Sequence, residues 1–127
     1  MKRLIILVCA LLAVCVGGCA LIQWRLGVLL DDAHIHTVRI HASMEEGNIT
    51  QAKDDLVALA TLWKDYSRLL ELVCDHNDIH AVKTHIIQAH ICINYTDMEE
   101  FYSAVALIGE NIEHIRDSEG LSLFNIL

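Results

Sequence analysis

Apolar residues recur three and four positions apart along most of this chain, a spacing that predicts amphipathic helices. The pattern is most regular between residues 50 and 74, and two further runs follow it at residues 78–94 and 96–120. We expect the apolar positions of these three helices to share one core. They are Ala52, Leu56, Leu59, Trp63, Tyr66, Leu70 and Val73, then Ile79, Val82, Ile86, Ala89 and Ile93, then Met98, Phe101, Val105, Ile108, Ile112 and Ile115.

The N-terminal segment is apolar on all sides instead of along one stripe. After Lys2 and Arg3, the residues from Leu4 to Ile22 carry no charge and no polar side chain larger than that of Cys. As a helix this segment would rise about 28 Å, close to the hydrocarbon thickness of a bilayer. Basic residues before the segment favour a cytoplasmic N-terminus. We therefore predict a transmembrane anchor at residues 1–24 and an extracytoplasmic domain at residues 25–127.

A second interpretation of the same segment is a lipoprotein signal. The apolar run to Val16, followed by Gly17, Gly18 and Cys19, matches a signal that is cleaved before a cysteine, which would place a lipid on Cys19. The apolar run continues past Cys19, however, and no flexible polar tether follows it. We favour the uncleaved anchor and keep the lipoprotein as the alternative.

Helix ends are indicated by residues that cap or interrupt. The anchor is expected to continue into a first helix that ends near Gly47, and Asn48 or Thr50 would cap the next one, which ends near Cys74. For the later helices we predict Asp78 as a cap, a capping box of Thr96 with Glu99, and an end at Gly120. The apolar tail after Gly120, residues 121–127, is expected to pack on the domain.

A short pattern occurs twice and suggests an internal repeat. Residues 35–41 and 79–85 both place Ile, His, Val and His at the same spacing, and each copy is followed by an Asn-x-Thr, at Asn48 and at Asn94. On this match Ile35, Val38 and Ala42 would face the core. The expected fold is all-α, an up-down-up-down four-helix bundle made of two similar helical hairpins.

Composition narrows the classes of function. The chain has no proline, which suits long helices. Residues 25–127 carry seven Lys or Arg against seventeen Asp or Glu, a formal charge of −10, which disfavours binding to nucleic acid. Cys74 and Cys92 would lie about 20 Å apart in an antiparallel hairpin, so we expect two free thiols.

Several short motifs resemble a known family. They are Glu46 to Ala52 at a helix start, the pair Leu62 and Trp63, the turn from Cys74 to Ile79, and the closing residues 123–127. The chain resembles small membrane-anchored helical proteins of Gram-positive bacteria that are grouped as domain of unknown function 4363. The resemblance implies a helical extracytoplasmic domain and supplies no catalytic residue.

Eight histidines are the main candidates for chemistry. His36 and His85 would lie at similar heights on two helices, and His76 and His80 are four residues apart, so a metal or haem site is one hypothesis. The Glu-x-x-His spacing of di-iron bundles and a Cys-x-x-Cys-His motif are both absent from the sequence. A histidine at a helix boundary is more often structural, and His76 could bond the last carbonyls of the preceding helix. We therefore assign no metal ligand, and we expect no cofactor.

No serine lies in a nucleophile motif and no glycine-rich loop is present in the sequence, so we expect no enzyme activity. The predicted function is a membrane-tethered module that contacts another protein or takes part in envelope assembly. The alternative is a helical bundle that senses a metal, haem or a small molecule through its histidines.

Overall fold

The computed structural model describes residues 1–126, and the side chains of residues 1–119. Within that range the chain is all-helical, as predicted, and contains no strand. The first helix runs unbroken from the apolar segment into the domain, which confirms the expected continuity. The helices are α1 (Lys2–Glu45), α2 (Ile49–Asp65), α3 (Ser67–Val73), α4 (His76–Asn94) and α5 (Met98–Ile126).

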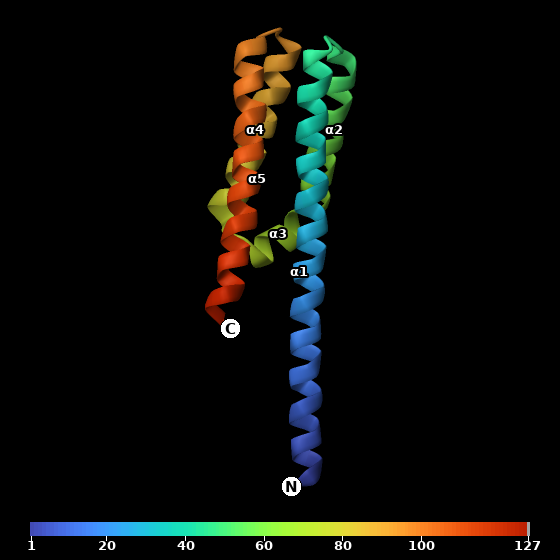
Figure 1. The fold of residues 1–127 in the computed structure, drawn as a ribbon, viewed down its shortest axis with the longest axis vertical. Coiled ribbons are helices and arrows are strands. Elements are labelled where there is room, and N and C mark those ends of the chain that lie inside the picture. Colours follow the sequence, from blue (N-terminus) through green and yellow to red (C-terminus); the bar gives the residue numbers. More distant parts are fainter. Residues whose placement is uncertain (127) are drawn as a thin grey trace.

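Four long helices lie side by side, and the N-terminal half of α1 projects alone from the end of this group (Figure 1). α1 packs against α2 and α5, and α4 packs closely against α5 and less closely against α2. The short helix α3 connects α2 to the start of α4. The N-terminus and the C-terminal end of α5 both lie toward the end from which α1 projects (Figure 1).

The apolar stripes predicted for the later helices form the core. Every predicted position on α4 is buried, as are five of the six on the last helix. Tyr66, Val73 and Met98 are partly buried and pack against the edge of that core. Burying a large apolar side chain contributes about 1.5–3 kcal/mol, so these stripes supply the main stabilisation of the domain.

The predicted core face of α1 was wrong. Ile35 and Val38 are 46% and 53% exposed, and Ala42 is exposed as well. The face that α1 turns toward α2 and α5 includes two polar residues, Thr37 and Ser43. Its buried residues are Leu26, Leu29, Leu30, Ala33, Thr37, Ile40, Ser43 and Met44.

The turns after α1 and α4 have the same backbone geometry. In the first turn Gly47 adopts φ +74°, and the Asn48 N–H donates to the Ser43 carbonyl at 2.8 Å. In the second turn Thr96 adopts φ +61°, and the Asp97 N–H donates to the Cys92 carbonyl at 3.0 Å. Both are Schellman ends, in which a residue of positive φ lets the chain reverse after the last helical turn.

The helices that follow these turns are capped in the same way. Asn48 Oδ1 accepts from the Gln51 N–H at 3.1 Å, which confirms Asn48 as a cap. Asp97 Oδ1 accepts from the Glu100 N–H at 3.2 Å. The predicted capping box of Thr96 with Glu99 was therefore wrong, because the cap is one residue later.

Buried positions recur along the described helices, but at a different spacing from the one the histidines suggested. Asn48 and Asp97 are 49 positions apart, whereas the two histidine patterns are 44 apart and the two Asn-x-Thr motifs 46. At the spacing of 49, buried residues match buried residues in both hairpins. The pairs are Leu30 and Ile79, Ala33 and Val82, Thr37 and Ile86, Ile40 and Ala89, Ser43 and Cys92, Met44 and Ile93, Ala52 and Phe101, Leu56 and Val105, Leu59 and Ile108, and Trp63 and Ile112.

Three predicted helix ends also need correction. The single helix expected up to Cys74 is interrupted at Tyr66, where the backbone leaves helical geometry (φ −98°, ψ 7°). α4 is capped by Asp75, whose Oδ1 accepts from the Asn77 N–H at 2.8 Å, and not by Asp78. α5 continues through Gly120 to Ile126. The predicted packing of the tail side chains lies outside the described side chains.

We predict that Thr96→Gly stabilises the protein. A non-glycine residue in the left-handed region costs about 1–3 kcal/mol, and Thr is β-branched, so glycine should relieve this strain. After the larger entropy that glycine loses on folding, we expect a gain of about 1 kcal/mol in the free energy of unfolding. Chemical denaturation followed by circular dichroism measures this change.

Thr50→Gly is the matched control, because Thr50 is exposed and lies within the first turn of α2. Glycine there removes no strain and should lower stability by up to about 1 kcal/mol. A Thr96→Gly variant that is as unstable as Thr50→Gly would contradict the strained turn.

Candidate functional site

A groove of about 480 Å³ lies between α2 and α3 on one side and α4 on the other. It is located where α4 packs less closely against α2 than against α5. Its size falls within the range of sites for small molecules. The lining residues are Ala60, Trp63, Lys64, Ser67, Glu71, His76, Ile79, His80, Lys83, Ile86 and Ile87.

The groove has a basic end and an apolar end. Lys83 and the two histidines precede Ile86 and Ile87 along α4, and Lys64 lines the groove from α2 on the other side. The rings of His76 and His80 are stacked, with centroids 6.4 Å apart and planes at 15°. Glu71 is the one acidic side chain on the described wall. The surface is therefore locally basic in a domain that is otherwise strongly acidic.

The apolar end continues into a second hollow of about 360 Å³ along the same two helices. The two hollows share Ala60, Lys64, Ile86 and Ile87. Beyond them, Val57, Ile87 and Ile91 are each half exposed, at 50%, 51% and 53%. An exposed apolar row that continues a hollow is typical of a binding surface.

Trp63 forms part of the groove wall and is 3% exposed. This confirms its predicted place in the core. Its indole N–H is buried and has no acceptor among the described residues. A buried donor without a partner is unusual, because leaving it unsatisfied costs about 1–3 kcal/mol.

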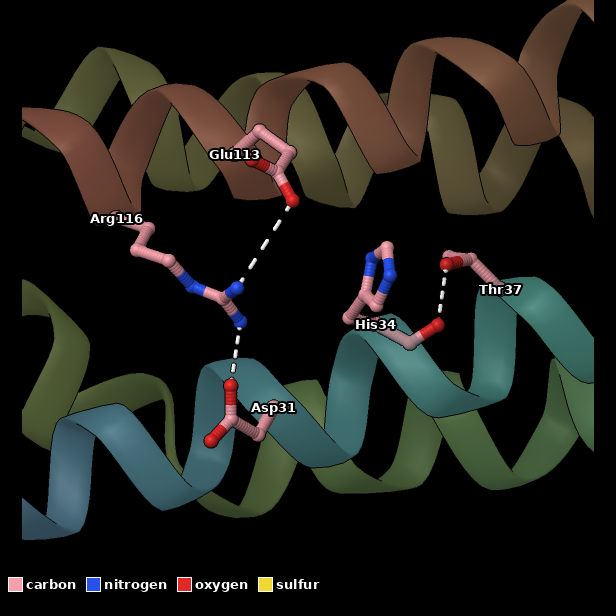
Figure 2. Close-up of polar contacts among 5 residues, drawn as sticks. All are labelled: Asp31, His34, Thr37, Glu113 and Arg116. Carbon is pink, nitrogen blue, oxygen red and sulfur yellow. Dashed lines mark hydrogen bonds and ion pairs between the residues drawn. The ribbon is translucent and has the colours of Figure 1, made fainter.

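The packing between α1 and α5 is the counterpart of the groove, and here the two helices are bridged. Arg116 of α5 donates to Asp31 Oδ1 of α1 at 2.6 Å and lies 3.9 Å from Glu113 Oε1 (Figure 2). The side chain of His34 points from α1 toward α5 (Figure 2). Thr37, one turn further, donates to the His34 carbonyl at 2.6 Å. Two carboxylates thus lie beside the one guanidinium at this junction.

The repeat spacing of 49 relates this junction to the groove residue by residue. Asp31 corresponds to His80, and Arg116 corresponds to Ser67. Glu113 corresponds to Lys64, which reverses the charge. The α1–α5 junction has ion pairs of Arg116 with two acids, whereas the groove has Ser67, His80 and Lys64 at the corresponding positions. The groove therefore lacks the ion pair that joins α1 to α5.

The histidine candidates are divided between different places. His36 on α1 and His85 on α4 are half-buried and 49 positions apart, and the buried Nδ1 atom of each has no hydrogen-bond partner among the described side chains. His76 and His80 lie together on the groove wall. No group of three or more metal-ligating side chains is found among the described residues.

The structural role predicted for His76 was wrong. His76 is the first residue of α4, directly after the cap Asp75, and does not lie at the end of α3. It is therefore next to the positive end of a helix dipole instead of the negative end.

The two cysteines outside the apolar segment are free, as predicted. Cys74 lies in a polar hollow of about 400 Å³ with Asp78, His114 and Glu119. Burial, and then the Glu119 carboxylate beside the thiol, raise the pKa of Cys74 to about 12. Burial, with the charges of Asp97 and Glu100, also raises the pKa of Cys92. Both groups therefore stay as thiols at neutral pH.

Sequence reasoning missed the two lysines of the groove. Lys64 and Lys83 are ordinary exposed positions on two separate helices, and only the pairing of α2 with α4 brings them to one groove. A usable signal was present in the sequence: Lys64 follows Val57 and Ala60 at helical spacing, and Lys83 precedes Ile86 and Ile87 at the same spacing. That signal needed the pairing of α2 with α4 before it pointed to one site.

These features define a class of protein, an all-helical domain carried on a long apolar N-terminal helix. The model of the family described as Domain of unknown function (DUF4363) matches residues 27–126, so the chain belongs to that family. The match begins just after the apolar segment. Neither a comparison with curated proteins nor one with solved structures gives a match to the chain.

We predict that Cys74 alkylates slowly. Iodoacetamide reacts with the thiolate, so a pKa near 12 should reduce the rate at pH 8.5 by at least about tenfold relative to the unfolded chain. Peptide mapping by mass spectrometry after timed quenching measures the rate at this cysteine. The raised pKa also means that stability from this group is present below about pH 9 and declines above it, where only the unfolded chain ionises.

Glu119→Gln is the control for the cause. It removes the charge that opposes ionisation and leaves burial in place, so alkylation should become faster without reaching the unfolded rate. Equal rates for Cys74 in the folded and urea-unfolded chain would show that its surroundings do not suppress the thiolate.

Proposed function

We propose that this protein is a single-pass, membrane-tethered module without enzyme activity. Its helical domain faces the extracytoplasmic side and contacts another protein or takes part in envelope assembly. The observation that carries the proposal is α1, one helix that supplies both the apolar segment and part of the domain core.

The two halves of α1 have opposite environments. An 18-residue window of the helix has a mean hydropathy of 3.0, with none of it buried against the rest of the protein. Such a helix is long and apolar enough to cross a membrane. From Leu26 onward the same helix buries one face in the core. The exposed first half packs on none of the described side chains, so we propose a bilayer as its surrounding.

Between the two halves lie residues suited to a membrane surface. Trp24 is 67% exposed and is followed by Arg25, and such pairs are enriched at interfaces. A small hollow joins Trp24 and Arg25 to Leu62 and Tyr66 at the end of α2. In our proposal the break at Tyr66 and the helix α3 thus lie next to the membrane.

We propose that the four long helices form an up-down-up-down bundle of two similar hairpins. The shared turn geometry, the shared caps and the burial spacing of 49 support this arrangement. In it, α1 and α4 lead away from the membrane, and α2 and α5 lead back. The two turns at Gly47 and Thr96 would be the parts furthest from the bilayer.

The charge of the domain favours a particular kind of partner. A formal charge of −10 on residues 25–127 disfavours nucleic acid and anionic lipid surfaces. Complementary charge accelerates association between proteins, so a partner with a basic surface fits best.

The lipoprotein alternative would also tether the domain. It requires cleavage before Cys19, which lies inside the unbroken helix α1, with Ala20, Leu21 and Ile22 continuing the apolar run. The continuity of that run supports the uncleaved anchor.

The groove favours a second candidate function, a bundle that senses a small molecule. His76 and His80 lie on its wall, and its volume of about 480 Å³ suits a small ligand. This candidate is compatible with the membrane tether. It differs from the first candidate in binding a small molecule instead of a protein.

The topology is tested with Glu46→Cys, placed in the exposed turn after α1. We expect a membrane-impermeant maleimide to label this cysteine in intact spheroplasts. Labelling of the native cysteines should be low. Cys92 is buried, the raised pKa of Cys74 keeps it as the less reactive thiol, and the other cysteines lie in the apolar segment. Mass spectrometry of the extracted protein reads the label.

Lys2→Cys is the matched control, because it lies on the opposite side of the apolar segment. It should be labelled only after permeabilisation. The reverse pattern of labelling would rule out the proposed orientation. The same spectra give the intact mass, so a loss of residues 1–18 with added acyl groups would establish the lipoprotein instead of the anchor.

The interaction role is tested by crosslinking in native membranes with mass spectrometry of the products. We expect a reproducible partner whose crosslinked peptides are rich in Lys or Arg. Its recovery should fall at high salt, because exposed charges are screened. Absence of a reproducible partner across repeated preparations would count against the role.

A further inference from the structure

We propose that the groove between α2 and α4 binds a single-chain amphiphile with a carboxylate head. The carboxylate lies between Lys64 and Lys83, and the apolar chain extends along Ile86 and Ile87 toward Val57 and Ile91. The inference rests on the second candidate function, the sensing bundle, and names the chemical class of its ligand.

Charge is the first argument. At the α1–α5 junction, the carboxylates of Asp31 and Glu113 surround Arg116. The corresponding wall of the groove has Lys64 in place of Glu113 and His80 in place of Asp31. The groove thus has basic side chains at the two positions where the junction has acids, Ser67 at the position of Arg116, and Glu71 as the acid in its lining.

Neither lysine of the groove has an ion-pair partner among the described side chains. Lys64 and Lys83 therefore present two positive charges to one hollow from opposite walls, and Glu71 is the acid in the same lining. Like charges that face one hollow repel each other, and an anion between them relieves that repulsion. A bound carboxylate would take the role that the side chains of Asp31 and Glu113 have at the α1–α5 junction.

The apolar chain is indicated by the direction of the groove. Along α4 the order is His76, His80 and Lys83, then Ile86, Ile87 and Ile91. On the other wall, Lys64 lines both hollows, and Val57 lines the second hollow together with Ile91. A carboxylate held between Lys64 and Lys83 would therefore have the apolar row beside it, in the second hollow.

Size decides between a compact anion and an amphiphile. Phosphate or acetate would occupy a small part of a 480 Å³ groove and leave the half-exposed Val57, Ile87 and Ile91 uncovered. An alkyl chain that continues into the adjoining 360 Å³ hollow covers this row. Each buried methylene contributes about 0.8 kcal/mol, so covering the row provides affinity that the head alone would lack.

Trp63 supplies a direct readout, since it lies in the groove wall. The chain has two tryptophans, and Trp24 is largely exposed, so Trp24→Phe leaves Trp63 as the sole reporter. The full chain with this substitution is placed in phosphatidylcholine nanodiscs. Trp63 emission is then followed during titration with dodecanoate below its micelle concentration, with empty nanodiscs correcting for partition into lipid.

We expect a saturable change in Trp63 emission with dodecanoate. The double variant Lys64→Glu with Lys83→Glu should weaken apparent affinity at least about tenfold, since it places two like charges beside the carboxylate. Both positions are exposed, so the variant should keep its helix content by circular dichroism. Lys53→Glu is the matched control: it is also on α2, lies outside both hollows, and should bind dodecanoate like the parent.

Dodecyltrimethylammonium and zinc chloride complete the test. The first has the same chain with a cationic head, and weak or absent binding supports selection of the carboxylate. Equal binding of both amphiphiles, no saturable response to dodecanoate, or full affinity in the lysine double variant would each overturn the inference. A saturable response to zinc alone would also overturn it and leave the sensing bundle in place with a different ligand.

Discussion

The first half of α1 is apolar on every side and its second half on one side only. The rest of the structure depends on this change in the pattern of apolar residues along one helix. The first half has no side chain buried in the protein until Leu26. From there, a stripe of buried residues continues to Met44 and receives α2 and α5. Because the helix has no break between these halves, the domain is assembled directly on the extension of the apolar segment.

The apolar stripes of the later helices could be predicted because the residues at this spacing are buried or half-buried, and Asp55 is the one buried polar residue among the described side chains of these helices. Leu56 on α2, Ile86 on α4 and Ile108 on α5 each belong to such a stripe, in which buried residues recur three or four positions apart. On α1 the rule fails, because Thr37 and Ser43 are buried while Ile35 and Val38 are exposed. The Thr37 hydroxyl bonds the His34 carbonyl on its own helix, so a polar residue is satisfied inside the core. Periodicity alone cannot detect such a residue.

The repeat illustrates a related limit. The two turns resemble each other most closely, although their residues differ. Gly47 and Thr96 both have a positive φ, and Asn48 and Asp97 each cap the helix that follows. The recurring histidine pattern is more conspicuous in the sequence, yet it matches Ile35 with Ile79, one exposed and one buried. Backbone geometry and burial are repeated more faithfully than residue type. The groove depends on how α2 packs against α4, which the sequence pattern does not specify, so its two lysines could not be assigned to one site beforehand.

The unbroken course of α1 also has a mechanical consequence. A helix turns by about 100° and advances 1.5 Å with each residue. With no hinge between Leu4 and Glu45, a single residue inserted near Trp24 would swing the whole domain around the helix axis by that angle and carry it outward by that step. The number of residues between the apolar segment and the core therefore decides which face of the domain is turned toward neighbouring molecules.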